Sequence, residues 1–253
     1  MNKDKEKVTE RHGYHMKLRI KFRKFGPVRF IGHLDVMRFF QKAIRRAEID
    51  VAYSSGFSPH QIMSFAAPLG VGLTSNGEYM DIEVHSITSC EDVKTKLNAA
   101  SVPGIEIVGV NILPEKAGNA MASVAAASYT VHFREGREPK INLAKALPVF
   151  LAQEEILITK ETKKGSRQVD LKAGIYELCC EEDTLGIAIH MLVDASSGGN
   201  IKPTQIIEAL LAKNGETLTE NALLVNREDT FTNIGTEEAP QFVPLDAIKD
   251  GSL

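Results

Sequence analysis

The stretch Lys17-Leu-Arg-Ile-Lys-Phe-Arg-Lys-Phe25 begins with basic and apolar side chains that alternate from Lys17 to Arg23. A period of two is typical of a β-strand with one face toward a core, and that face would carry Leu18, Ile20 and Phe22. The other face, from Lys17 to Arg23, would point its basic side chains outward. This strand is the first element that the sequence predicts.

An amphipathic helix is predicted after this strand, because the apolar period changes from two to three and four. The apolar stripe consists of Leu34, Met37, Phe40, Ile44 and Ala47. The opposite side carries Asp35, Arg38, Lys42 and Arg45, so this helix is expected to be apolar inside and basic outside. Asp35 lies in the first turn, where the helix dipole favours a carboxylate, and can pair with Arg38. That structural role competes with any catalytic role for Asp35.

The following elements complete one α+β unit. Strands are expected at 62–65 and 79–84 with Asn76-Gly77 as a tight turn between them, and then a helix at 91–99 and a strand at 105–113. The same order recurs in the second half, with strands at 128–133, 155–161, 168–172, 184–192 and 223–227 and helices at 143–153 and 202–211. The predicted fold class is α+β, with two tandem ferredoxin-like (β-α-β-β-α-β) units and mainly antiparallel sheets.

The chain is accordingly divided into five segments. They are a disordered leader or tag remnant (1–15), a basic N-terminal ferredoxin-like unit (16–117), a linker (118–127), a C-terminal ferredoxin-like unit (128–230) and an extended tail (231–253). The division rests on the order of elements, because residue-level similarity between the two halves is slight.

Composition excludes several classes of protein. Of 253 residues, 43% are hydrophobic and 25% charged, which is ordinary for a globular protein. No apolar run approaches the roughly 18 residues of a membrane span, so a cytoplasmic protein is expected. Cys90, Cys179 and Cys180 are expected to be free thiols and fall short of the roughly four ligands of an iron–sulfur cluster. No cofactor and no metal site are predicted.

Charge is unevenly distributed along the chain. Residues 1–60 contain 14 Lys and Arg against 6 Asp and Glu, whereas the remaining residues contain 16 against 27. This asymmetry favours an anionic partner for the N-terminal part. The alternative is an ordinary solvated surface, since charge runs are common on proteins.

Catalytic residue types gather between Arg29 and Glu83, but they complete no known signature. His33 and Asp35 stand at i and i+2, which point apart on a helix, so they do not make a metal-binding pair. Ser58 with His60 and Asp35 supplies the residue types of a nucleophilic triad, but Ser58-Pro59 is not a nucleophile elbow. The loop that contains Gly56, Ser58 and Pro59 is expected to be a turn-rich connector.

Basic residues give a better functional signal than the catalytic types. The predicted phosphate-binding residues are Arg19, Lys21, Arg23, Arg29, Arg38, Lys42, Arg45 and Arg46. Aromatic residues among them are limited to Phe22, Phe25, Phe30 and Phe57, and Phe22 is expected in the core. Because few aromatic side chains are expected to be exposed, sequence-specific reading of single-stranded nucleic acid is not predicted.

A family resemblance is carried by several short motifs. They are Arg29-Phe-Ile-Gly-His-Leu-Asp35, Arg45-Arg-Ala47, Gly56-Phe-Ser-Pro-His60, Ser64-Phe-Ala66, Pro68-Leu-Gly70 and Glu78-Tyr-Met-Asp81. As a set they resemble the radical-SAM-linked (radical SAM-associated) protein family of unknown function, in its stand-alone form. The resemblance implies a cobalamin-binding radical SAM protein as partner, and it carries over no catalytic residue. Two tandem ferredoxin-like units also resemble the core of tRNA pseudouridine synthases, at the level of fold.

Three functional hypotheses follow. The leading one is an accessory RNA-binding or substrate-presenting protein that acts with a separate radical SAM enzyme in RNA or ribosome-related modification. The second is an RNA-modifying enzyme, similar to pseudouridine synthases, that uses Asp35 with His33 or His60 assisting, and it requires these side chains to converge on one cleft. The third is a protein-interaction module without RNA contact.

Overall fold

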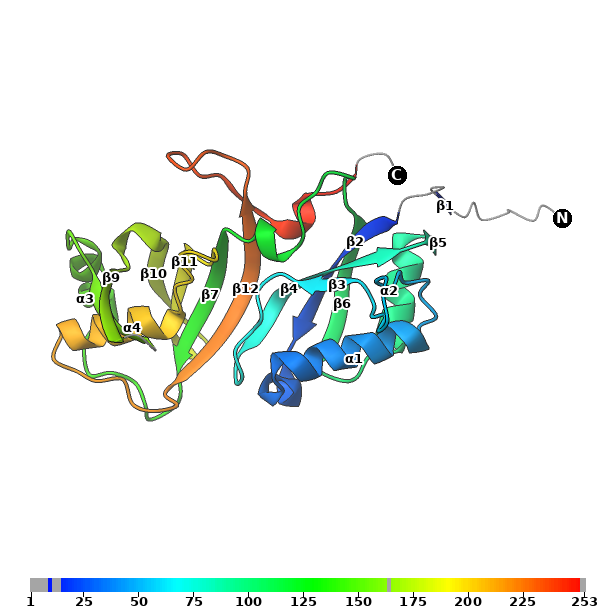
Figure 1. The fold of residues 1–253 in the computed structure, drawn as a ribbon. Coiled ribbons are helices and arrows are strands. Elements are labelled where there is room, and N and C mark those ends of the chain that lie inside the picture. The colour runs from blue at the N-terminus through cyan, green and yellow to red at the C-terminus, as the bar shows by residue number, and fades with distance from the viewer. Residues whose placement is uncertain (1–8, 11–14, 163–164, 251–253) are drawn as a thin grey trace. The chain divides into compact units, whose positions relative to one another are not determined.

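The computed structural model describes residues 9–10, 15–162 and 165–250, and these residues form two compact units (Figure 1). Unit 1 comprises residues 1–124 and 229–253, and unit 2 comprises residues 125–228. Both combine α-helices with mainly antiparallel strands, so the expected α+β class is confirmed. The proposed leader, 1–15, lies largely outside the described residues. Every helix within the described residues is too short or too polar to cross a membrane.

Unit 1 is built from a sheet and two helices. Its elements are β1 (Thr9–Glu10), β2 (Met16–Lys24), η1 (Gly26–Phe30), α1 (His33–Arg46), β3 (Met63–Phe65), β4 (Thr74–Val84), β5 (Ser86–Ile87), α2 (Cys90–Ala99), β6 (Ile105–Ile112), η2 (Met121–Ser123), the end of β12 (Leu223–Asn233), β13 (Phe242–Pro244) and η4 (Leu245–Ala247). The sheet has the order β6-β2-β4-β3, and all three of these pairings are antiparallel.

The apolar face of β2 forms the centre of the unit 1 core, as its alternation predicts. Leu18 and Ile20 are fully buried, and Phe22 packs edge-on against Phe40 of α1 with ring centroids 4.7 Å apart. Helix α2 adds Val93 and Leu97 to the same cluster. The two helices therefore cover one face of the sheet, and burying these large apolar side chains stabilises the unit.

The other face of the sheet was expected to be open, and this expectation is wrong at Arg19. The Arg19 side chain is only 1% exposed, because η4 lies over it and the Leu245 carbonyl accepts a hydrogen bond from its guanidinium at 3.2 Å. The Asp250 N–H also bonds the Ile112 carbonyl of β6 at 2.8 Å. Alternation shows which face is polar, but it does not show that a segment from the far end of the chain covers it.

This covering segment also corrects the expected domain boundaries. Residues 231–253 were expected to be an extended tail, but the described part of that segment, through residue 250, packs on unit 1. Strand β13 pairs with the end of β12, and Leu245 is fully buried. The expected linker, 118–127, includes η2 and the start of the next strand. We call residues 242–250 the C-terminal strap.

Unit 2 has a sheet, two helices and a separate ribbon. Its elements are β7 (Ala126–Phe133), α3 (Leu143–Leu151), β8 (Leu157–Thr162), β9 (Gly165–Asp170), η3 (Lys172–Gly174), β10 (Ile175–Asp183), β11 (Gly186–Asp194), α4 (Pro203–Lys213) and the start of β12. The sheet order is β10-β11-β7-β12, and β8 pairs only with β9. Strand β10 was not predicted. It lies at the edge of the sheet and buries only Leu178, so its sequence lacks the alternation that marks a half-buried strand.

Two local expectations in unit 1 are also wrong. Leu34 was assigned to the apolar stripe of α1 but is 60% exposed, and the buried stripe consists of Val36, Phe40, Ala43 and Ile44. Gly77 was expected in a tight turn but lies inside β4, where Thr230 of β12 donates a hydrogen bond to its carbonyl. Glycine is required there by the close approach of β12, because a methyl group on Gly77 would lie 2.7 Å from the Asp229 Cα.

Substituting Gly77→Ala is therefore expected to destabilise the protein by about 1–3 kcal/mol, the usual cost of forcing a methyl group into packed structure. Urea unfolding measures this change. Gly118→Ala is the matched control, since the nearest atom to its added methyl is the Ser123 Oγ at 3.6 Å. Equal stability of the two variants would contradict the close packing of β4 against β12.

Candidate functional site

The outer side of α1 presents exposed cations, as its helical spacing predicts. Arg38, Lys42 and Arg45 are all exposed and follow one another at i, i+4 and i+7, which places them on one side of the helix. The Arg38 guanidinium lies 3.3 Å from the Asp35 carboxylate, and both side chains are more than 60% exposed. Such an exposed pair is weak, so it leaves the Arg38 charge available for another anion. We call Arg38, Lys42 and Arg45 the α1 cation stripe.

Arg46, the last residue of α1, has a structural role. Its guanidinium donates a hydrogen bond of 2.7 Å to the carbonyl of Ala100, the C-cap residue of α2. A cation at a helix C-terminus is favoured by the helix dipole and satisfies a carbonyl that lacks a partner within the helix. Arg46 therefore ties α1 to α2, and we leave it out of the α1 cation stripe.

Two cations of β2, Arg19 and Arg23, are paired with carboxylates. Arg19 makes two hydrogen bonds to Asp81, of 2.8 and 2.9 Å, and both residues are buried. Arg23 pairs with Glu106 at 3.0 Å. Because the charge of Arg19 is buried with its carboxylate partner, the strand face offers less free charge to a phosphate than its sequence indicates.

Arg29 and Lys24 lie just before α1 in the sequence and make local contacts there. The Arg29 guanidinium stacks over the Phe30 ring, 4.7 Å from its centroid. The buried Lys24 ammonium donates a 3.0 Å hydrogen bond to the Ile31 carbonyl, two residues before the helix begins. Burial lowers the pKa of Lys24, and the nearby Glu78 carboxylate opposes that shift. Lys24 was not singled out from the sequence, although a charged residue that ends an alternating strand is a usable signal.

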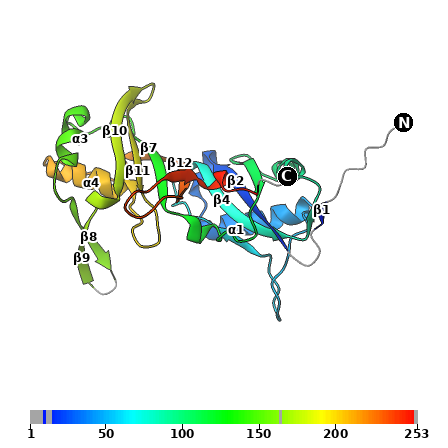
Figure 2. The same cartoon turned by 90° about the horizontal axis from the view of Figure 1, so that it is seen from above.

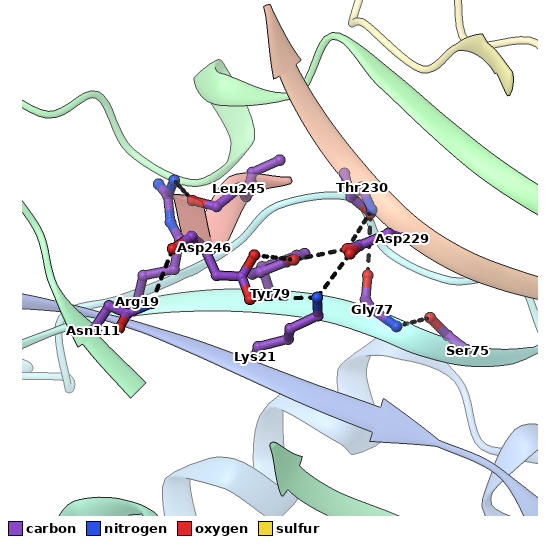
Figure 3. A network of polar contacts seen from close by, with 10 residues as sticks. All are labelled: Arg19, Lys21, Ser75, Gly77, Tyr79, Asn111, Asp229, Thr230, Leu245 and Asp246. Carbon is purple, nitrogen blue, oxygen red and sulfur yellow. Dashed lines mark hydrogen bonds and ion pairs between the residues drawn. The ribbon is translucent and has the colours of Figure 1, made fainter. Parts of the chain in front are cut away.

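A polar network joins the C-terminal strap to the sheet (Figure 3). The Lys21 ammonium lies 2.7 Å from the Asp229 carboxylate and 3.4 Å from that of Asp246. The buried Tyr79 hydroxyl lies 2.7 and 3.1 Å from the same two carboxylates. The pKa of Tyr79 is raised far above its ordinary value, mainly because the side chain is buried and also because the two carboxylates lie close to its hydroxyl. The groups of this network satisfy one another, so its evident role is to hold the strap.

The three candidate catalytic residues are held by other partners. His33 is the first residue of α1, and its ring meets the Phe65 ring edge-on at 5.1 Å. Asp35 pairs with Arg38, and the His60 ring is hydrogen-bonded to Ser54. Across the described residues no hydrogen bond or ion pair joins any two of His33, Asp35 and His60. That part of the chain also contains no group of three or more His, Cys, Asp or Glu side chains placed to hold a metal.

The loop that contains Gly56, Ser58 and Pro59 forms the end of a narrow hairpin. Tyr53 and Gln61 pair across its base, and Figure 2 shows this segment, which follows α1, projecting away from unit 1. Residues 55–60 are all exposed, and Phe57 is completely so. We call residues 53–61 the projecting hairpin. Its exposed ring was not predicted, although an aromatic residue within a run of turn-forming residues is a signal for such exposure.

A pH test follows from Tyr79. Folding keeps its phenol protonated, whereas an unfolded tyrosine ionises near pH 10, so its contribution to stability is complete below about pH 10 and is lost as the pH rises. Tyr79→Phe is expected to cost about 1–3 kcal/mol at neutral pH, because it removes the one hydroxyl donor that the Asp229 and Asp246 carboxylates share. The difference in unfolding free energy from the wild type should shrink between about pH 8 and about pH 10.5. Tyr53→Phe, on the exposed hairpin, is the control, and a constant difference for Tyr79→Phe would contradict the prediction.

Comparisons with solved structures give only distant likenesses. The crystal structure of a Cbf5-Nop10-Gar1 complex contains a chain that is 10% identical, with a TM-score of 0.46, over 84% of this chain and 48% of that one. A structure of an unknown protein from Galdieria sulphuraria is 11% identical, with a TM-score of 0.24, over 85% of this chain and 98% of that one. This chain thus spans about half the length of the first, and TM-scores this low carry no functional argument.

The sequence comparisons are more specific. No curated protein sequence matches the chain. The sequence model of a family described as "Uncharacterized protein conserved in bacteria (DUF2344)" matches residues 17–203, a range that includes β2, α1 and the projecting hairpin. Because the match covers well over half of the sequence, the chain belongs to the DUF2344 family.

Proposed function

We propose that this protein binds RNA through the α1 cation stripe and presents it to a separate radical SAM enzyme that modifies RNA or ribosome-related components. The observation that carries the RNA part is the run of three exposed cations on one side of α1, where Asp35 is the only carboxylate of the helix. The cooperation with a cobalamin-binding radical SAM protein rests on the motif resemblance. RNA, rather than a small anion, is the partner that suits a row of separate charges.

The spacing of the stripe supports an extended polyanion. From Arg38 to Arg45 the helix rises by about 10 Å, at 1.5 Å per residue. That length is close to the Debye length at 0.1 M salt, so the three charges act on a nearby chain of phosphates together. Their long side chains are exposed and reach into solvent. Binding of this kind releases counterions from the nucleic acid and therefore weakens steeply as salt is added.

The same proposal includes a tandem ferredoxin-like arrangement of the two units. In unit 1 the elements run β2-α1-β3-β4-α2-β6, with sheet order β6-β2-β4-β3. In unit 2 they run β7-α3-β10-β11-α4-β12 once the ribbon β8-β9 is set aside, with sheet order β12-β7-β11-β10. The two orders correspond strand by strand, which supports one repeated β-α-β-β-α-β plan.

The charge requirement is tested by the triple variant Arg38→Glu, Lys42→Glu, Arg45→Glu. Its affinity for tRNA or rRNA fragments is expected to fall by about ten-fold or more at 0.1 M salt, and its dependence on log salt should flatten by about 2 units. The matched control reverses three exposed cations of unit 2, Arg137→Glu, Lys145→Glu and Lys213→Glu, with the same change in net charge. If the stripe variant binds RNA as tightly as this control, the RNA-binding proposal fails.

The accessory role is tested in cells by mass spectrometry of modified nucleosides. Deleting the gene is expected to remove or reduce one RNA modification, because the modifying enzyme loses the protein that presents its substrate. Wild-type protein and the unit 2 control should restore the modification, whereas the stripe variant should not. An unchanged set of modifications in the deletion strain would rule out this role.

A further inference from the structure

Resting on the proposed RNA binding, we propose that the projecting hairpin stacks the ring of Phe57 on an unpaired base, so that the RNA recognised contains a single-stranded segment. The sequence predicted few exposed aromatic residues and no sequence-specific reading of single strands. The structure corrects the first point, because Phe57 is fully exposed and Tyr53, Phe30 and Phe25 are each more than one-third exposed. An aromatic face beside cations is the combination that single-strand-binding proteins use.

Hydrogen bonds close the base of the hairpin whose tip carries Phe57. Ser54 and His60 are joined by three hydrogen bonds at its base: Ser54 N–H to the His60 carbonyl at 2.8 Å, His60 N–H to Ser54 Oγ at 3.1 Å, and Ser54 Oγ with His60 Nδ1 at 2.8 Å. Gly56, just before the ring, has a φ of +112°, a conformation that L side chains rarely adopt. A hairpin whose base is already closed loses less backbone entropy when a base stacks on its tip.

One carbonyl group connects the hairpin to the α1 cation stripe. The Gln41 carbonyl of α1 accepts hydrogen bonds from Arg45 Nε and from Gln61 Nε2, both at 3.2 Å. Arg45 belongs to the stripe, and Gln61 closes the base of the hairpin. The hairpin therefore begins beside the stripe. An RNA strand whose phosphates lie along the stripe passes the hairpin, and its bases come within reach of the ring.

The composition of the hairpin favours a base over a protein surface. Residues 54–59 carry no charged side chain, and Phe57 stands alone among Ser, Gly and Pro. A single Phe ring offers at most about 200 Å² of contact, whereas a stable protein interface buries about 800 Å² on each partner. A nucleobase has one flat face of a size that matches a ring. Stacking of this kind accepts any base, so the expected preference is for unpaired RNA and not for a particular sequence.

The experiment compares Phe57→Ala and Phe57→Trp with the wild type on an unstructured RNA oligonucleotide and on a duplex of the same length. Phe57→Ala is expected to weaken single-strand binding by about five-fold or more and to leave duplex binding unchanged. The chain contains no tryptophan, so Phe57→Trp introduces a unique fluorophore. Its emission should be quenched by the single strand and not by the duplex, with affinity retained. Leu185→Ala, an exposed apolar residue of unit 2, is the control.

Each failure has its own signature. If wild-type protein binds neither RNA, or the stripe variant binds as well as its unit 2 control, the proposed function itself fails. If the stripe variant weakens binding but Phe57→Ala does not, or if the tryptophan emission of the Phe57→Trp variant is unchanged by the single strand, base stacking is ruled out. Equal loss of single-strand and duplex binding in Phe57→Ala also overturns the proposal. Unchanged RNA binding with lost association to the purified radical SAM partner would assign the hairpin to protein docking instead.

Discussion

A buried ion pair between β2 and β4 determines how unit 1 uses the polar face of its sheet. Arg19 and Asp81 stand directly opposite each other in the strand register, and their side chains meet through two hydrogen bonds. Removing one partner of such a pair leaves an uncompensated buried charge, which typically costs about 3–5 kcal/mol. The Leu245 carbonyl accepts a further hydrogen bond from Arg19. The charge of Arg19 is therefore used to hold the fold, whereas Arg38, Lys42 and Arg45 on the outer side of α1 are exposed.

The strand–helix order of unit 1 could be predicted because its signals are local. The alternation of β2 and the buried spacing of Phe40 and Ile44 depend only on neighbouring residues, and the structure contains both elements. Other features depend on distant residues. The need for glycine at Gly77 comes from the approach of Asp229, and the covering of Arg19 comes from the C-terminal strap. Neither the glycine requirement nor the covering of Arg19 can be predicted from the neighbouring residues.

The same distinction applies to the candidate site. The α1 cation stripe was predicted because helical spacing fixes which side chains share a side of the helix. The neutralisation of Lys21 could not be predicted, because Asp229 and Asp246 lie more than two hundred residues further along the chain. The exposure of Phe57 depends on how the projecting hairpin leaves the unit, and turn-forming residues predict a bend without predicting its direction.

The discontinuity of unit 1 also has a consequence for synthesis on the ribosome. Unit 2 is one continuous stretch, residues 125–228, whereas unit 1 needs residues from both sides of it. When only the first 124 residues have been made, Lys21 and Tyr79 lack both carboxylates of their network, and the Leu245 carbonyl that caps Arg19 is absent. Domains usually fold in the order in which they are made. Here unit 1 is the first to be synthesised in part and the last to be complete. Unit 2 can fold while unit 1 still lacks the end of β12 and the C-terminal strap.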